Sequence, residues 1–213
     1  MEALLGEYAW PVIAVDPGRG EWLDTGMKAF SRASDLATYI ASQLREGERP
    51  EPILAVTQEA GPATFRYVWE SELPCTIVVD EVDLWAPNRG KTNEHLFNCL
   101  KRGRKIGGSD SDSSISVIAG AHAGQDVDRR IARFAAHVVF RQSEPSAIGR
   151  AEKYIHSDVD VSRLAEYEFT LSRKAEALRF DVGTYGPFAY TLNPDKMAIE
   201  RTSEWSSGER TPI

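Results

Sequence analysis

The residues best suited to chemistry are three acids, Asp80, Glu81 and Asp83, at the end of a short apolar run. The run, residues 76–79, is β-branched throughout, which favours a strand buried on both faces of a parallel sheet. Asp80 and Glu81 then lie at the carboxyl end of that strand, where α/β proteins bind their ligands. The pattern is typical of the Walker B motif of nucleotide hydrolases. In that motif the first acid holds Mg²⁺ and the second orients the attacking water.

The usual partner of a Walker B motif is a phosphate-binding loop, G-x-x-x-x-G-K-[S/T], between a strand and a helix. The one Gly-Lys pair is Gly90-Lys91, followed by Thr92, but the position of the first glycine is taken by Trp85. This segment also follows the acidic strand instead of preceding it. We interpret residues 90–92 as a loop and a helix cap, with Thr92 as the cap. The phosphate-binding loop is absent from the sequence.

Residues 80–83 also spell D-E-x-D, the motif of superfamily 2 helicases. Those enzymes carry a small Ser-Ala-Thr-type motif on the following strand. Here residues 119–124 read Ala-Gly-Ala-His-Ala-Gly, which does not match. The helicase interpretation is the weaker one.

Basic residues cluster twice, as Lys-Arg-Gly-Arg-Lys at residues 101–105 and as three arginines within residues 129–133. A solvated helix face explains either cluster. The functional alternative is that an arginine such as Arg130 reaches a neighbouring subunit's nucleotide, or that Arg104 and its neighbours touch phosphates. His122 follows a predicted strand, where a γ-phosphate sensor would lie, although a lone histidine is more often structural.

The two cysteines, Cys75 and Cys99, fall in a predicted strand and a predicted helix. Two buried thiols are therefore favoured over a disulfide, which fits a reducing compartment. His95 lies four residues before Cys99, as two metal ligands on one helix face might. No second pair completes a tetrahedral site, so both are interpreted as packing residues.

Composition bounds the class of protein. The chain has 213 residues, 42% hydrophobic and 27% charged, which predicts a soluble globular domain. The net charge of −7 argues against coating nucleic acid with the whole surface, but it allows a local basic patch. No apolar run approaches the ~20 residues that span a bilayer, and no signal pattern opens the chain. We expect a cytoplasmic protein.

Predicted strands alternate with predicted helices along the chain. The strands are expected at residues 11–15, 52–56, 76–79, 115–119 and 137–141, and the helices at 34–44, 63–73, 92–101, 126–135, 145–154 and 161–174. This order predicts an α/β fold with right-handed crossovers, a mostly parallel sheet and helices on both faces. We expect one domain over residues 1–195, with a core at 10–155 and a helical and hairpin extension at 156–195. Residues 196–213 are expected to form a flexible tail.

The order of these pieces resembles the FtsK/HerA group of P-loop ATPases over residues 10–155. The likeness rests on residues 12–17, 76–85 and 115–119, on the Arg-Gly-Arg turn at 102–104, on Asp128-Arg-Arg130, and on 138–145. Within that group the chain looks most like the small genome-packaging ATPases of membrane-containing viruses. It also resembles the zonula-occludens-toxin-like phage assembly proteins.

The resemblance implies a three-layer P-loop-type sheet, ATP and Mg²⁺ as cofactors, and a homo-oligomeric ring. Its partners would be double-stranded DNA and virion or assembly proteins. Asp80 matches the acid that holds Mg²⁺ through water, and Glu81 matches the catalytic base. Asp16 ends the strand that follows the P-loop unit in that family and is a further cofactor-binding candidate. The next strand usually ends in a polar Gln, Asn or Thr, where His122 or Gln125 stands here.

Three interpretations of function remain open. The first is the ATPase core of a DNA translocase for viral genome packaging, as a fragment lacking about 25–40 upstream residues, the length of one strand–loop–helix lead-in. The second is a degenerate member that serves as a structural or regulatory subunit of a phage assembly complex. The third interpretation is an α/β interaction domain that binds no nucleotide.

Overall fold

A computed structural model describes most of the chain, in two compact units. The described residues are 11–16, 18, 27–47, 53–103, 114–121, 126–134, 138–155, 160–165, 168–171, 188–193, 198–206 and 209–212. The parallel unit comprises residues 4–122 and 126–134, and the antiparallel unit comprises residues 1–3, 123–125 and 135–213. The sequence predicted one domain over residues 1–195.

The parallel unit is built on a five-stranded sheet. Its strands are β1 (Val12–Val15), β2 (Lys28–Phe30), β3 (Ile53–Val56), β4 (Cys75–Val79) and β5 (Ile115–Ala119). They lie in the order β2-β3-β1-β4-β5, and every pair is parallel. The predicted α/β fold with a mostly parallel sheet is confirmed. The short edge strand β2 was not predicted, because three residues carry too little pattern to reveal a strand.

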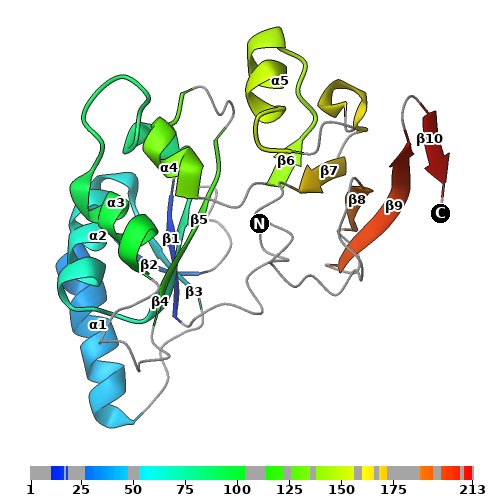
Figure 1. The fold of residues 1–213 in the computed structure, drawn as a ribbon. Helices are drawn as coiled ribbons and strands as arrows, with labels where there is room; N and C mark the ends of the chain where they lie inside the picture. Colours follow the sequence, from blue (N-terminus) through cyan, green and yellow to red (C-terminus); the bar gives the residue numbers. More distant parts are fainter. Residues whose placement is uncertain are drawn as a thin grey trace. The chain divides into compact units, whose positions relative to one another are not determined.

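Helices flank this sheet: α1 (Ala33–Glu46), α2 (Gly61–Glu70), α3 (Glu94–Arg102) and α4 (Arg129–Phe134). The chain moves in one direction along the sheet from β2 to β3, to β4 and to β5. Right-handed crossovers therefore place α1, α2 and α3 on the same face. Neighbouring helices contact one another in sequence order, with α4 beside α3 (Figure 1).

The core of the parallel unit lies between the sheet and these helices. Alternate strand residues face the helices, and they are Ile13, Val15, Leu54, Val56, Ile77 and Val79. The helices contribute Leu36, Ile40, Phe65, Val68 and Leu96. Every residue of β1 and β4 is buried, as the apolar run 76–79 predicted. Each large apolar side chain buried in this way stabilises the fold by roughly 1.5–3 kcal/mol.

Helix α3 starts later than predicted, and Thr92 is not its cap. The helix begins at Glu94, and the Asn93 side chain accepts a hydrogen bond from the N–H of Leu96 at 3.0 Å. Asparagine is among the best N-cap residues, so it fills the role assigned to its neighbour. The Thr92 hydroxyl is free to bond elsewhere in the fold, as described below.

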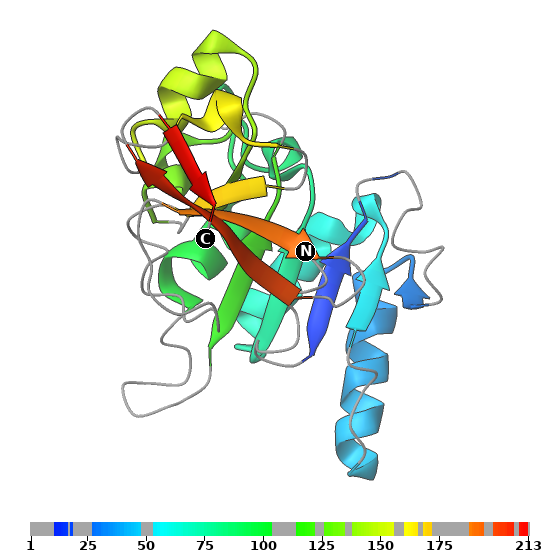
Figure 2. The ribbon, with the colours of Figure 1, turned by 90° about the vertical axis from the view of Figure 1, so that its right-hand side faces the viewer.

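The antiparallel unit holds a second sheet. Its elements are β6 (Val138–Phe140), α5 (Pro145–Ala151), a 3-10 turn (Val161–Arg163), β7 (Glu168–Leu171), β8 (Phe188–Asn193), β9 (Ala198–Ser206) and β10 (Glu209–Pro212). The strand order is β10-β9-β8-β7-β6, antiparallel throughout. Figure 2 shows β9 and β10 as two red arrows that point in opposite directions.

Several sequence predictions fail in this unit. The strand predicted at 137–141 exists as β6 but pairs with β7 and not with the parallel sheet. The helix predicted at 161–174 is wrong, because residues 168–171 form β7, where Phe169 packs on Phe140 with ring centroids 5.5 Å apart. Strands β9 and β10 occupy residues expected in a flexible tail. The hairpin predicted around 183–187 lies outside the described residues.

The helices of the described part include none with the length and apolarity needed to span a membrane. The predicted free thiols are confirmed, since both cysteines are unpaired and buried. Burial raises the pKa of the Cys75 thiol, with a further contribution from nearby Cys99. Burial also raises the pKa of the Cys99 thiol to about 12.

We expect both thiols to react slowly with an aromatic disulfide reagent at pH 8 in the native protein. The thiolate is the reactive form, and burial disfavours it at both cysteines. In guanidinium chloride, where a free cysteine has a pKa of about 8.5, both should react rapidly. Fast labelling of either thiol without denaturant would contradict the burial of Cys75 in β4 or of Cys99 in α3.

Candidate active site

Two of the predicted acids meet at the carboxyl edge of the parallel sheet. Val15 of β1 is in register with Val79 of β4, so Asp16 and Asp80 come directly after paired residues of neighbouring strands. Neighbouring strands in a sheet lie about 4.8 Å apart. Asp16 is 1% exposed, and its Oδ1 accepts a hydrogen bond from the N–H of Gly18 at 2.7 Å. Asp80 is half-buried. The structure therefore brings together two acids that lie 64 positions apart in the sequence.

Glu81 occupies a strained turn directly after Asp80. Its backbone is left-handed, with φ 49° and ψ 51°, a conformation that costs a non-glycine residue roughly 1–2 kcal/mol. Asp80 Oδ1 accepts the N–H of Glu81 at 3.0 Å. The N–H of Val82 donates to the carbonyl of Gly120, just past β5, at 2.9 Å. Strain of this kind clusters at functional sites, where the surrounding fold enforces it.

Gln58 also belongs to this edge and was missed in the sequence. It lies two residues past the end of β3, which pairs with β1. A Cβ placed on Gly18 would be 2.5 Å from Oε1 of Gln58, so this amide sits against the turn that follows Asp16. The predicted strand 52–56 was the signal that could have found it, because polar residues just past parallel strands share one edge.

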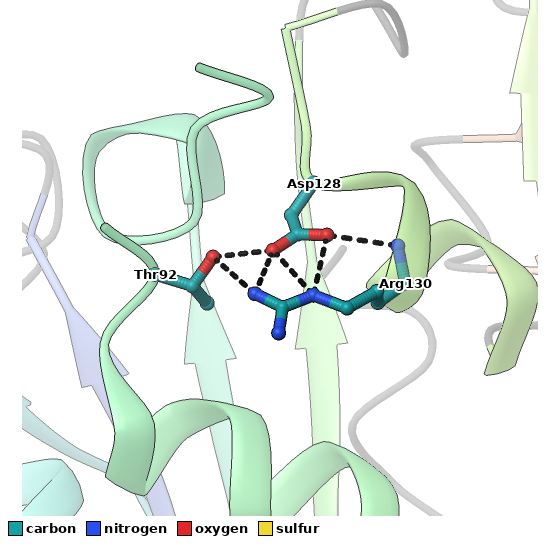
Figure 3. Close-up of polar contacts among 3 residues, drawn as sticks. All are labelled: Thr92, Asp128 and Arg130. Carbon is teal, nitrogen blue, oxygen red and sulfur yellow. Dashed lines mark hydrogen bonds and ion pairs between the residues drawn. The ribbon is translucent and has the colours of Figure 1, made fainter. Parts of the chain in front are cut away.

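A second polar cluster joins Thr92, Asp128 and Arg130 (Figure 3). Arg130 Nη2 donates to Asp128 Oδ2 at 2.6 Å, and its Nε lies 3.1 Å from both carboxylate oxygens. The Thr92 hydroxyl donates to the same carboxylate and accepts from Arg130 Nη2 at 3.3 Å. Asp128 also accepts the backbone N–H of Arg130 at 2.8 Å, as a residue before a helix does.

This cluster fastens the segment after the acids to the start of α4. The N–H of Asp128 donates to the carbonyl of Ala86 at 2.8 Å, and the N–H of Asn88 donates to the carbonyl of Asp126 at 2.6 Å. Asp128 is buried, whereas the Arg130 side chain is 62% exposed. The hydrogen bonds from Arg130 and Thr92 hold the pKa of the Asp128 carboxyl well below its usual range, despite its burial.

The other predicted site residues are placed less fully. Arg130 is bound within its own chain by Asp128 and Thr92, and its role as an arginine finger stays a prediction. His122 and Arg104 lie outside the described residues. Neither His95 nor Cys99 joins a metal site, because no group of three or more His, Cys, Asp or Glu side chains in the described part is placed to hold a metal ion.

The solved structures with a similar fold include viral genome-packaging NTPases. The genome packaging NTPase B204 from Sulfolobus turreted icosahedral virus 2 is similar in its AMPPCP complex, with a TM-score of 0.56, 15% identity, and coverage of 95% of this chain and 83% of that chain. Its AMP complex gives a TM-score of 0.57 and 16% identity at the same coverage. The DNA-packaging ATPase B204 from Sulfolobus Turreted Icosahedral Virus gives 0.54 and 15% over the same shares.

This chain shares the fold of a viral packaging NTPase. The likeness to genome-packaging ATPases predicted from the sequence is confirmed at the level of the fold. No protein-family model and no curated protein matches the chain.

The acids at the edge fit Mg²⁺ better than they fit a triphosphate. Mg²⁺ takes oxygen ligands and is commonly held by one or two carboxylates with water and substrate phosphates, as Asp80 beside Asp16 would allow. A triphosphate needs a cradle of backbone N–H groups. Here the N–H groups of Gly18 and Glu81 donate to carboxylates of the site itself. These two N–H groups are therefore engaged and do not offer themselves to a phosphate.

Glu81→Gly is expected to raise the free energy of unfolding by about 1 kcal/mol, because glycine adopts the left-handed conformation without a Cβ penalty. Glu72 is a matched control, since its φ is also 49° and it lies before β4, at the opposite edge of the sheet. Glu72→Gly should give a similar gain. Urea denaturation measures both. If Glu81→Gly destabilised the protein while Glu72→Gly stabilised it, side-chain contacts of Glu81 would outweigh the strain.

Asp128→Asn is expected to lower the urea midpoint at pH 7, because the neutral amide loses the charge-assisted bonds to Arg130. The native pKa is depressed, so this carboxylate stabilises the fold above its unfolded pKa of about 3.9 and loses that effect as pH falls further. The difference between wild type and Asp128→Asn should therefore shrink below about pH 4. Asp126 is exposed, so Asp126→Asn serves as the control and should change the urea midpoint little. A difference that persists undiminished at pH 2 would contradict this assignment.

Proposed function

We propose that this chain is the nucleotide-hydrolysing core of a motor that moves double-stranded DNA during viral genome packaging. In this proposal Asp80 holds Mg²⁺ through water and Glu81 is the catalytic base. The observation that carries the proposal is the placement of these two acids at the carboxyl end of a central buried strand, with Glu81 in an enforced left-handed turn. The fold shared with packaging NTPases supports it.

The residues of the edge have separate tasks in this proposal. When bound, Mg²⁺ would neutralise charge on the phosphates. Asp80 is half-buried, with Oδ1 oriented by the N–H of Glu81, and it would accept hydrogen bonds from metal-bound water. The carboxylate of Glu81 would orient the attacking water and take its proton. Asp16, buried beside them, adds negative charge that favours a cation at this edge.

The finer assignments extend the same proposal. Phosphate-binding groups would lie outside the described residues, with Arg104 among those that touch phosphate and His122 as the γ-phosphate sensor. The chain would assemble into a homo-oligomeric ring. The partners of this ring would be virion or assembly proteins, in host cytoplasm or in the virion. The sequence likeness to the FtsK/HerA group supports these assignments.

A second function is favoured by one observation, the hydrogen bonds that the N–H groups of Gly18 and Glu81 make to carboxylates of the edge instead of to a phosphate. Such a chain would be a structural or regulatory subunit of the same assembly, with the packaging fold but without turnover. The two functions differ in whether the full chain hydrolyses the nucleotide, and hydrolysis requires that the chain bind it.

Titration calorimetry with Mg²⁺ and ATP, together with phosphate release, tests the proposal. Wild type should bind and hydrolyse ATP, and Glu81→Gln should lower turnover by 10²-fold or more, because the amide cannot accept the proton. Its affinity for ATP should change little. Glu72→Gln, the same exchange at a residue that also has a φ of 49°, should leave turnover unchanged.

The outcomes separate the alternatives. No binding at millimolar ATP would contradict hydrolysis by this chain and favour the structural or regulatory subunit. Binding with equal turnover in wild type and Glu81→Gln would refute the assignment of the base.

A further inference from the structure

A basic surface lies on the two contacting helices α3 and α4, on different elements from the acids of the sheet edge. Its cations are Lys101 and Arg102 in the last turn of α3, and Arg129 and Arg130 in the first turn of α4, all exposed. We refer to these four residues as the α3–α4 basic surface. Its charge is opposite in sign to the net charge of −7 of the whole chain.

One aromatic ring brings the cations of the two helices together. The Phe97 ring on α3 has Lys101 Nζ 5.8 Å from its centroid and Arg130 Cζ 4.9 Å from its centroid. Arg130 is in addition fixed by Asp128 and Thr92 (Figure 3). Lys101 and Arg130 are therefore held near one another, and Arg102 and Arg129 are their neighbours in the sequence.

Within the described part, three of these four cations have no acidic partner. Asp128 pairs with Arg130, but no hydrogen bond or ion pair joins the side chains of Lys101, Arg102 or Arg129 to another residue in the described part. Lys101 and Arg102 suit the carboxyl end of a helix, where cations are favourable. Arg129 and Arg130 open a helix, where cations are unfavourable, so helix stability does not explain them.

We propose that the α3–α4 basic surface binds the phosphate backbone of double-stranded DNA. Lys101, Arg102 and Arg129 would contact phosphates, and Arg130 would hold Phe97 and its neighbours in place. The choice of double-stranded DNA among polyanions rests on the proposed packaging function. Phosphate contacts carry no sequence information, so the binding would be independent of sequence, as a translocated genome requires.

A membrane of acidic lipids is the less suitable polyanion. Helices that bind membrane surfaces bury large apolar side chains beside their cations. The large apolar side chains that are exposed in the described part are Leu44, Leu84 and Phe140, and none of them lies on α3 or α4. The surface offers charge without an apolar anchor, which matches a nucleic-acid backbone.

Fluorescence anisotropy of a labelled 30-base-pair duplex, titrated with the full chain without nucleotide from 50 to 300 mM salt, tests the inference. Three phosphate contacts predict a slope of about −3 for log affinity against log salt, since each contact contributes about −0.9. Lys101→Glu with Arg102→Glu should weaken binding at least tenfold at 100 mM salt and reduce the slope by about 2. Lys101→Gln with Arg102→Gln should act in the same direction, more weakly.

The matched control is Arg32→Glu with Arg45→Glu, two exposed cations at the ends of α1. This control and the Lys101→Glu, Arg102→Glu variant each lower the net charge by four units. Melting temperatures test whether each variant folds. Equal weakening by the control would overturn the inference, because overall charge would then explain binding. Binding to anionic vesicles but not to the duplex would also overturn it.

The test is independent of the nucleotide site. The duplex titration needs no ATP, so a failure to bind DNA would leave the hydrolysis proposal standing. Conversely, absence of ATP hydrolysis would leave a positive DNA result intact.

Discussion

The candidate site depends on the parallel register of β1 with β4. That register aligns Val15 with Val79, so the next residue of each strand, Asp16 and Asp80, emerges at the same edge. Both strands are buried on both faces, so neither can slip by one residue without moving its acid along the edge. The packing of the helices on Ile13, Val15 and Ile77 therefore maintains the strand register, and the register places Asp16 and Asp80 side by side.

The segment after Asp80 is held at both ends, and this is what sustains the strain at Glu81. Its beginning is tied to β5 through Val82 and the carbonyl of Gly120. Further on it is tied to the start of α4, where Ala86 accepts from Asp128. The backbone N–H of Asp128 makes the second of these contacts, and the Asp128 carboxylate holds the start of α4 through Arg130 and Thr92. The cost of burying that carboxylate is offset by the hydrogen bonds from Arg130 and Thr92.

The sequence revealed the features whose signals are local. A β-branched run followed by acids is visible in eight residues, and four of the five parallel strands were predicted from short apolar runs. The features that failed depend on distant partners. Thr92 bonds to Asp128, 36 positions away, and nothing near Thr92 shows this, so it was assigned as a helix cap. Residues 168–171 form a strand because β6 and β8 flank them, and this pairing overrides their local helical pattern.

The separation of charge by element explains how an acidic chain could serve two polyanions. Asp16 and Asp80 follow neighbouring strands at the edge of the sheet, where the proposed function places a cation that in turn holds phosphate. On α3, Glu94 is seven residues from Lys101, about 10 Å along the helix axis. The Debye length at physiological salt is about 8 Å, so Glu94 is largely screened from a phosphate at Lys101. Local arrangement, and not the net charge of −7, therefore decides what each surface can bind.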